Sequence, residues 1–465
     1  MDAPGGHGLP SGGAIGEGVG VPARVLGTLD ASCIVIGAII GVGIFFSPWK
    51  VASLTESAGL ALLAWVVGGA MALCGAVAFA EIGRRYHASG AQYQALRDGW
   101  GGLGAFVFVV CNATAIQAGA AAIIAAICAA NLLAMVGGEG RGAPPPEATM
   151  TIACALIALV TVANVLGVRW GARLQVVTVF AKVAALLAIV ALAAVAAPRV
   201  PPAPTGPARG EALPGLSGVI AALAPAFFAY GGWQHALWIA GEVREPRRTL
   251  PRAIVGGVAV VVGVYVLANW AYLALLGREG VATSTALAAD AVSAALPGWG
   301  RRAVAGAVAL SALGVLNAQL LSGPRLVYGM AADGRFFPPF GRLSARWGTP
   351  VAAIVMIGVL GIGLLLAAGV DRADKIVTGV VFIDGVFFVL TAGVILKGSW
   401  GAWARGEGGG MIRGARAAAA VFIVGEGALL AGSLMDPSTR EAVLIGVGWM
   451  IGAAALYAAR FRRAG

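Results

Sequence analysis

Residues 36–45 read IGAIIGVGIF, and Pro48 follows about one turn later. The stretch places three glycines inside an apolar run long enough to cross a bilayer. Glycine costs a helix interior about 1 kcal/mol relative to alanine, although membrane helices use it where two helices approach closely. A second run, residues 225–233, reads PAFFAYGGW. Taken alone, each run fits close packing as well as it fits a functional break in a helix.

The composition indicates a membrane protein. Hydrophobic residues make up 59% of the 465 residues and charged residues only 11%, whereas a soluble domain carries roughly 25% charged residues. Runs of about 20 apolar residues are long enough to span a bilayer. The sequence predicts an all-α integral membrane protein with about twelve spans, near residues 29–53, 59–82, 102–136, 149–168, 174–197, 216–241, 253–277, 303–330, 350–369, 375–396, 412–434 and 441–459.

The distribution of positive charge predicts the orientation. With the N-terminus inside, the inner segments hold 20 Lys and Arg, the outer segments hold 10, and Lys182 and Arg325 lie within spans. Cytoplasmic loops are enriched in Lys and Arg, so we expect both termini in the cytoplasm and the protein in the plasma (inner) membrane. The net charge of +11 therefore indicates a membrane pattern and no nucleic-acid partner.

Other segments add little chemistry. Residues 1–27 are rich in Gly and Pro, lack the charge pattern of a signal peptide, and predict a flexible cytoplasmic tail. The five cysteines lie in apolar stretches without CxxC spacing, so neither a metal site nor a disulfide framework is indicated. Nothing implies a cofactor.

The two glycine-rich runs gain meaning as a pair. They open the first and sixth spans, and interrupted spans at matching places in two halves point to an inverted-repeat transporter. Broken backbone inside hydrocarbon leaves amide and carbonyl groups that need partners. A zwitterion suits both kinds of group, since its carboxylate can take free N–H groups at a positive helix end and its ammonium can take exposed carbonyls.

With these residues the sequence resembles the amino acid–polyamine–organocation superfamily, particularly the L-type amino acid transporters and their bacterial relatives. Residues 37–45 with Pro48 look like the first-helix motif of that family, and 228–233 are similar to its sixth-helix motif. Residues 242–254 (EVREPRRTLPRAI) are similar to the inner loop that follows. Residues 321–328 (LSGPRLVY), with a later Asp-Gly and Pro338, look like the eighth span and its loop. The resemblance covers roughly residues 28–460.

The resemblance implies a LeuT-type fold with alternating access to a site at mid-membrane. The expected division is a first repeat at 28–200, a second at 210–398, and two further spans at 411–460, with discontinuous first and sixth helices. It implies that the carboxylate side of a bound amino acid is lined by Ile40, Gly41, Val42, Gly43 and Ile44. It further implies carbonyls from Phe228, Ala229, Tyr230 and Gly231 for the amino group, with Phe228 and Trp233 as gate residues.

Two departures from the family pattern matter. L-type members usually have Ser where this chain has Val42, so a hydroxyl is lost while the backbone N–H groups remain. Members that pair with a heavy subunit use a Cys in the loop after the third span. The corresponding loop here, residues 137–149, has none, so we expect no disulfide-linked partner. The oligomeric state is left open.

Lys182 lies near the middle of the fifth predicted span. A lysine there costs about 2.5–3.5 kcal/mol on insertion scales and needs compensation. By resemblance it matches a lysine of sodium-independent members, whose ammonium takes the place of a sodium ion and bridges the first and eighth spans. The expectation is sodium-independent transport.

Asp384, in the tenth predicted span, is a candidate proton or substrate contact, because a carboxylate inside a membrane is a site candidate by default. Structural pairing is an equal alternative, and the resemblance gives it no role. Asn317, on the eighth span, is a further candidate contact, although intramembrane amides more often bond neighbouring helices. Glu426 and His235 are weaker candidates, and Glu242 at an inner helix end is expected in a solvated or gating ion pair.

The leading interpretation is a secondary transporter of amino acids, neutral ones by preference, working by exchange (an antiporter) or facilitated uptake. Proton-coupled or exchange transport of cationic amino acids or polyamines is the alternative within that class. A non-transporting amino acid sensor is disfavoured by termini of about 27 and 5 residues. An enzyme is not expected, since the chain has no HExxH or GxSxG motif.

Overall fold

The computed structural model describes residues 20–137, 144–197, 212–296, 298, 300–369, 373–398 and 410–461. Within these residues the chain is helical, and its only β-type pairings are two isolated bridges. Eight helices are long and apolar enough to cross a membrane, or nine when a bent pair is counted as one span. The all-α class and the integral membrane character predicted from the sequence are therefore confirmed.

The first half of the described chain runs from α1 to α7. Its α-helices are α1 (Thr28–Ile39), α2 (Gly43–Leu54), α3 (Ala58–Arg85), α4 (Ala91–Cys111), α5 (Ala118–Gly137), α6 (Pro146–Val165) and α7 (Val168–Ala196). A π-helical turn, η1 (Asn112–Gln117), joins α4 to α5, so the third predicted span is part of one apolar stretch from Ala91 to Gly137.

The second half runs from α8 to the end. Its elements are α8 (Gly215–Phe228), α9 (His235–Trp238), η3 (Ala240–Glu242), α10 (Pro246–Thr283), α11 (Leu287–Ala295), α12 (Gly300–Ser322), α13 (Pro324–Ala332), η4 (Pro338–Gly341), α14 (Val351–Ala368), α15 (Ala373–Lys397), α16 (Ala415–Met435), α17 (Pro437–Leu456) and η6 (Tyr457–Phe461). α8 and α14 are apolar but shorter than the eight long spans.

The helix starts follow from local chemistry. Ser57 accepts a hydrogen bond from the backbone N–H of Leu60 and caps α3, and Asp436 caps α17 through Ser438. Proline occupies the first turn of α6, α10, α13 and α17, where its missing N–H costs nothing. These residues fix where the helices begin, and Pro324 does so inside the apolar stretch from Gly300 to Ala332.

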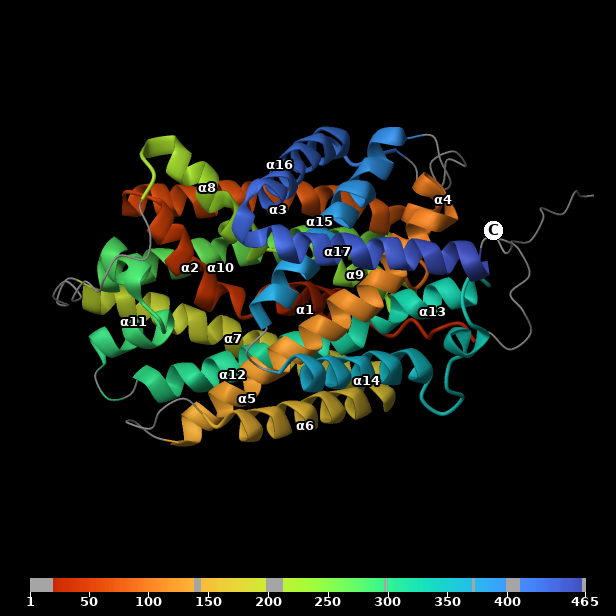
Figure 1. Ribbon diagram of the computed structural model, residues 1–465, viewed down its shortest axis with the longest axis horizontal. Coiled ribbons are helices and arrows are strands. Elements are labelled where there is room, and N and C mark those ends of the chain that lie inside the picture. The colour runs from red at the N-terminus through yellow and green to blue at the C-terminus, as the bar shows by residue number, and fades with distance from the viewer. Residues whose placement is uncertain are drawn as a thin grey trace, which may run out of the picture.

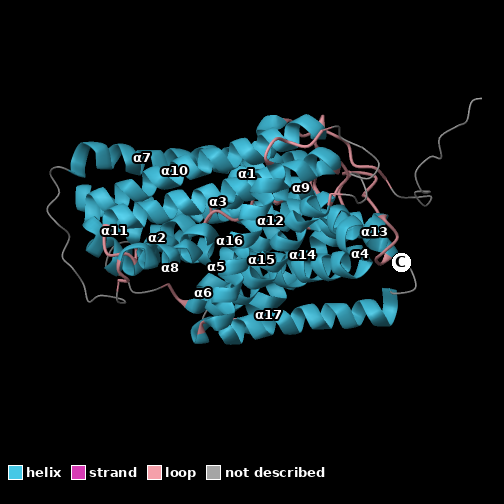
Figure 2. Ribbon diagram, turned by 90° about the horizontal axis from the view of Figure 1, so that it is seen from above, coloured by secondary structure: helices cyan, strands magenta, loops and turns pink. Residues whose placement is uncertain are grey.

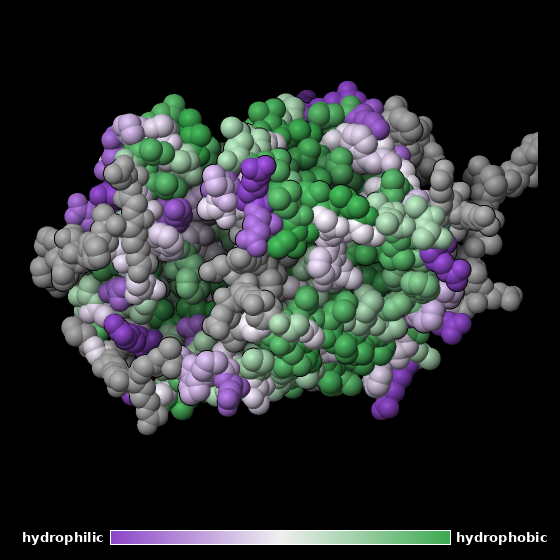
Figure 3. Space-filling model, in the orientation of Figure 1, coloured by the Kyte–Doolittle hydropathy of each residue, from purple (hydrophilic) through white to green (hydrophobic). Residues whose placement is uncertain are grey.

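The long helices lie roughly side by side along the longest axis of the molecule, as Figures 1 and 2 show. α1 packs against α7, α10 and α12, while α10 packs along α3 and α12 along α5. α1 therefore lies inside the bundle, surrounded by other helices. Figure 3 shows a broad apolar surface right of the centre of one face, with polar residues mainly at the left end and along the right-hand edge.

The end of the predicted N-terminal tail is packed against the bundle. Leu26 is buried and forms a bridge with Val243. The backbone N–H groups of Val25 and Leu26 donate to the carbonyl of Glu242, each at 2.9 Å. The described part of the tail thus covers the segment that follows α9.

Candidate functional site: two helix breaks in contact

The first interruption lies between α1 and α2. α1 ends at Ile39, α2 begins at Gly43, and the two helices meet at an angle of 45°. The last bond of α1 is the one from the Ile40 N–H to the Ile36 carbonyl. The first N–H groups of any helix lack intrahelical partners, so the start of α2 presents donors at the place where α1 presents carbonyls.

The carbonyls at the end of α1 are occupied by side chains from three helices. Lys182 of α7 donates from Nζ to the carbonyls of Gly37 (2.9 Å) and Ile40 (2.6 Å). Tyr265 of α10 donates to the Ile39 carbonyl at 2.9 Å. Ser311 of α12 lies 3.3 and 3.4 Å from the carbonyls of Ile40 and Gly41. The acceptor side of this break is therefore served by protein groups.

Lys182 is buried, with 1% of its surface exposed. A Cβ placed on Gly314 of α12 would lie 3.1 Å from its Nζ, so the ammonium sits between α1 and α12. A Cβ at Gly37 would overlap Gln175 and Val179 of α7. The glycines at both positions give α7 the room to bring this lysine to the break.

The second interruption follows α8. That helix ends at Phe228, and α9 does not begin until His235. The N–H groups of Tyr230 and Gly231 still bond to Phe227 and Phe228, at 2.9 and 3.2 Å. The turn then opens at Gly232, whose φ of 134° is one that side-chain-bearing residues rarely adopt.

The two interruptions touch each other. A Cβ on Gly232 would lie 2.8 Å from the carbonyl carbon of Ala38 and 2.9 Å from Ile39 N. A Cβ on Gly43 would lie 3.3 Å from the Cα of Ala229. Backbone from the two glycine-rich runs, almost 200 residues apart in the chain, is thus brought into direct contact inside the bundle.

The predicted site residues differ in their surroundings. Ile40, Gly41, Val42, Gly43 and Ile44 lie at the first break, and Phe228, Ala229, Tyr230 and Gly231 lie at the second. Phe228 is 46% exposed, whereas Trp233 is fully buried against Phe79, Phe388 and Phe422. The Tyr230 hydroxyl donates to the Trp65 carbonyl in α3, so this hydroxyl already has a protein partner.

The structure places Asn317 in helix packing. Its Nδ2 donates to the Gly171 carbonyl (2.9 Å) and to Gln175 Oε1 (2.8 Å), and its Oδ1 accepts from Asn164 at 3.1 Å. Both polar atoms are therefore engaged with α6 and α7. The residue supports the position of α7, and its amide is not directed at either break.

The break region includes polar residues that the sequence analysis did not single out as site residues. Tyr265 and Ser311 carry the hydroxyls that serve α1, and Gln234 between α8 and α9 donates to Asp384 Oδ2 at 3.4 Å. In the sequence, each of these residues is only a single hydroxyl or amide in an apolar run, which does not indicate a site. His235, by contrast, is engaged with Ser322 of α12 through Nδ1 at 2.5 Å.

A buried ion pair joins the segment after the second break to α13. Arg325 donates to Glu242 at 3.1 Å, and the two side chains are only 1% and 2% exposed. Arg325 also donates to the Leu321 carbonyl. Glu242 thus forms a buried ion pair, one of the two environments expected from the sequence.

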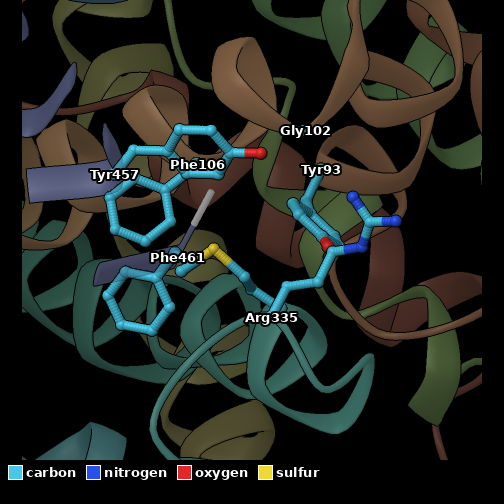
Figure 4. A pocket seen from close by; sticks show the side chains of 7 residues that line it. Tyr93, Gly102, Phe106, Arg335, Tyr457 and Phe461 are labelled. Atoms are coloured by element: carbon cyan, nitrogen blue, oxygen red, sulfur yellow. The ribbon is translucent and has the colours of Figure 1, made fainter. Parts of the chain in front are cut away.

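A small cavity lies elsewhere, where α4 meets α13 and η6. Figure 4 shows Tyr93, Phe106, Tyr457, Phe461 and Arg335 around it. Its volume is about 10 Å³, which is about the room that one water molecule needs. This cavity cannot hold an amino acid.

The chain is similar to amino acid transporters. A family model described as amino acid permease matches residues 26–457. The human cystine/glutamate transporter is 32% identical over 75% of this chain and 69% of its own length. The mouse b(0,+)-type amino acid transporter 1 is 29% identical over 75% of this chain and 71% of its own length, and the mouse Asc-type amino acid transporter 1 is 30% identical over 72% and 63%. The resemblance inferred from the sequence motifs is confirmed, and the chain belongs to the amino acid permease family.

Proposed function

We propose that this protein is a secondary transporter that moves amino acids across the plasma (inner) membrane by alternating access, through sodium-independent exchange or facilitated uptake. Neutral amino acids are the proposed substrates. The observation that carries the proposal is the direct backbone contact between the two interrupted helices. Membership of the amino acid permease family supports the same function.

In this proposal the substrate carboxylate binds the N–H groups of residues 41–44 at the start of α2, where the helix dipole is positive. The carbonyls of residues 228–231 accept hydrogen bonds from the ammonium. Phe228, which keeps 46% of its surface exposed, is the proposed gate over the substrate, and buried Trp233 is the proposed anchor of that gate. Asn317 serves to position α7.

The proposed sodium independence rests on Lys182. Its ammonium already neutralises the carbonyl end of α1 with two hydrogen bonds. A sodium ion suits the same backbone carbonyls and carries the same charge as an ammonium, so the Lys182 ammonium takes the place of one.

We further propose twelve spans arranged as two repeats of five, at 28–200 and 210–398, plus two more at 411–460, with both termini in the cytoplasm. The two interrupted helices open these two halves, which supports a LeuT-type arrangement. No disulfide-linked subunit is proposed, since the loop at 137–149 has no cysteine.

Cationic amino acids or polyamines are the second candidate class of substrate, and one specific observation favours them. Asp384 approaches the second break through Gln234, and a carboxylate there suits a cationic side chain. Relatives named for different substrates do not decide between the classes.

The experiment is counterflow in proteoliposomes containing the purified protein. Vesicles loaded with one unlabelled amino acid are diluted into labelled amino acid, across a panel of neutral, basic and acidic substrates, with and without Na⁺. The proposal predicts trans-stimulated uptake of neutral amino acids at the same rate in both media. Absence of counterflow with every amino acid would overturn it, and a strict preference for basic substrates would select the second class.

A further inference from the structure

Two acidic side chains lie together beside the second break. Asp384 belongs to α15 and Glu426 to α16, and these two helices pack against each other. A Cβ placed on Gly385 would lie 2.5 Å from Glu426 Oε1, so the Glu426 carboxyl rests on the backbone next to Asp384. The charge of one acid therefore acts on the other.

The pair has few partners. Glu426 is 7% exposed and its Oε2 has no hydrogen-bond partner, and Asp384 Oδ1 has none either. Among the described residues, no ion pair includes either acid. A buried carboxylate without a cation is very costly.

The neighbouring elements supply no cation within the part of the chain that is described. α3 faces α16 with Met71 and Gly75, and one turn along α16 Phe422 continues the apolar packing. His235 follows Gln234 directly in the sequence, but its imidazole is engaged with Ser322. Other charged and titratable side chains of the packed helices bond elsewhere: Glu81 with Arg84 and Arg85, Arg97 with Asp98 and Asp333, Tyr93 with Asp333, and Lys397 with the Gly99 carbonyl. Arg416 lies beside Gly398, and Tyr457 packs against Phe106. Arg440 and Glu441 lie in the first turn of α17.

Gln234 supplies an independent observation that points to a ligand. It is 4% exposed, its Nε2 donates to Asp384 Oδ2, and its Oε1 has no partner. An amide that offers one donor and one free acceptor can serve both forms of an acid. It donates to the carboxylate, and after rotation it accepts from the protonated carboxyl.

We propose that Asp384 and Glu426 together hold one exchangeable proton, and that its binding and release are coupled to amino acid transport through Gln234. This rests on the amino acid transport proposed above, and it replaces facilitated uptake with uptake driven by a proton gradient. Two neighbouring carboxyls without a cation do not readily both ionise in a low-dielectric site, so the proton belongs to the pair as a unit.

The link to transport follows from the position of Gln234. It lies in the segment between α8 and α9, two residues after Gly232, where the second break touches the first. A change of hydrogen bonding at the Gln234 amide therefore acts on the backbone proposed to hold the substrate ammonium. The proton enters the pair on one side of the membrane with the amino acid and leaves on the other.

The experiment uses the wild-type protein in sodium-free proteoliposomes with a pH-sensitive dye inside. Counterflow is measured first, without a gradient, and establishes transport. An acid-outside pH gradient is then imposed, with valinomycin and K⁺ clamping the membrane potential. We expect labelled neutral amino acid to accumulate above its outside concentration and the interior to acidify with added substrate.

Variants assign the coupling to the pair. Glu426→Gln and Asp384→Asn are each expected to lower the ratio of gradient-driven accumulation to counterflow by about tenfold, within the usual range of coupling free energies. The control is Glu279→Gln, whose side chain is 63% exposed in a loose contact with Arg278, and it should leave the ratio unchanged.

The failures are distinguishable. Counterflow without acidification or gradient-driven accumulation in the wild type overturns the proton coupling and leaves the transport function intact. Accumulation driven by Na⁺ and not by acid overturns it as well. Wild-type ratios in both acid variants reject the pair as the proton site. If no amino acid shows counterflow, the transport function falls and the coupling falls with it.

Discussion

Lys182 is one of three side chains that supply partners for the carbonyls at the end of α1, and it is the charged one. Its ammonium serves two backbone carbonyls, and without it Gly37 loses its only described side-chain partner. A buried polar group left without a partner costs about 1–3 kcal/mol. One side chain thus holds the geometry on which the proposed carboxylate site depends.

Replacing this residue gives the first prediction. Lys182→Ala should lower the rate of sodium-free counterflow by about tenfold or more. That factor corresponds to the free energy of leaving one buried carbonyl without a partner. Lys50→Ala removes an exposed lysine near the end of α2 and is the matched control. Initial rates in proteoliposomes, normalised to the amount of inserted protein, decide the matter, and wild-type rates in Lys182→Ala would contradict the assigned role.

Gly232 gives the second prediction, because a side chain there meets both strain and collision. Its φ is 134°, and a methyl group would press on the backbone of Ala38 and Ile39. Gly232→Ala should separate the two breaks and abolish counterflow. The control is Gly256→Ala in α10, where a Cβ meets nothing within 4 Å, so thermal stability should hold or rise by up to about 1 kcal/mol. Equal transport by the two variants would show that the breaks need no direct contact.

At the scale of elements, the segment after α9 is fastened from two sides. The buried Glu242 and Arg325 pair ties it to α13, and Leu26 covers it from the N-terminal side. A movement that opens the site toward this end of the molecule has to separate these groups. In the proposed transport cycle, the ion pair is part of the barrier between conformations.

The third prediction concerns that pair. Arg325→Met leaves the Glu242 charge buried and alone, which typically costs about 3–5 kcal/mol. Combining it with Glu242→Leu removes the lone charge and should restore most of the lost thermal stability, measured by size-exclusion chromatography after heating.

The comparison variant for this test is Arg248→Met, whose side chain is 77% exposed and 3.9 Å from Glu245. An exposed pair contributes about 0–1 kcal/mol, so its melting temperature should hardly move. If Arg325→Met were as stable as Arg248→Met, leaving the Glu242 charge buried without its partner would cost no stability, which would contradict the prediction.

The positions of the helix interruptions could be predicted from the sequence, because glycine and proline act through local backbone energetics. Residues 36–45 and 225–233 carry that signal directly. The partners of the interrupted ends could not be predicted. Ser311 and Tyr265 are single hydroxyls in apolar runs, and nothing local says which backbone carbonyl each one meets.

The acid pair shows the same limit. The sequence indicated Asp384 as an intramembrane carboxylate. It did not indicate that Glu426 lies beside it, because Glu426 is 42 residues away on a helix outside the proposed repeats. Their proximity depends on how α15 packs on α16 and on the missing side chain at Gly385. Asn317 illustrates the opposite case, since its partners on α6 and α7 became clear only from the packing.

At the scale of the whole molecule, the helices form one bundle with an apolar surface right of the centre of the face shown in Figure 3. α1 lies inside it, packed against α7, α10 and α12, where backbone groups left by the interruption need protein or ligand partners. The three helices packed on α1 supply the groups that hold the first interruption in place: α7 through Lys182, α10 through Tyr265, and α12 through Ser311.

The central claim is that main-chain groups of the two interruptions hold a zwitterion. A cryo-electron microscopy structure of the wild-type protein in lipid nanodiscs, with saturating neutral amino acid identified by counterflow, tests it most directly. The account predicts the substrate carboxylate within hydrogen-bond distance of N–H groups in residues 41–44, and its ammonium at the carbonyls of residues 228–231. Substrate bound elsewhere, or residues 37–44 and 226–233 forming continuous helices around it, would contradict the account.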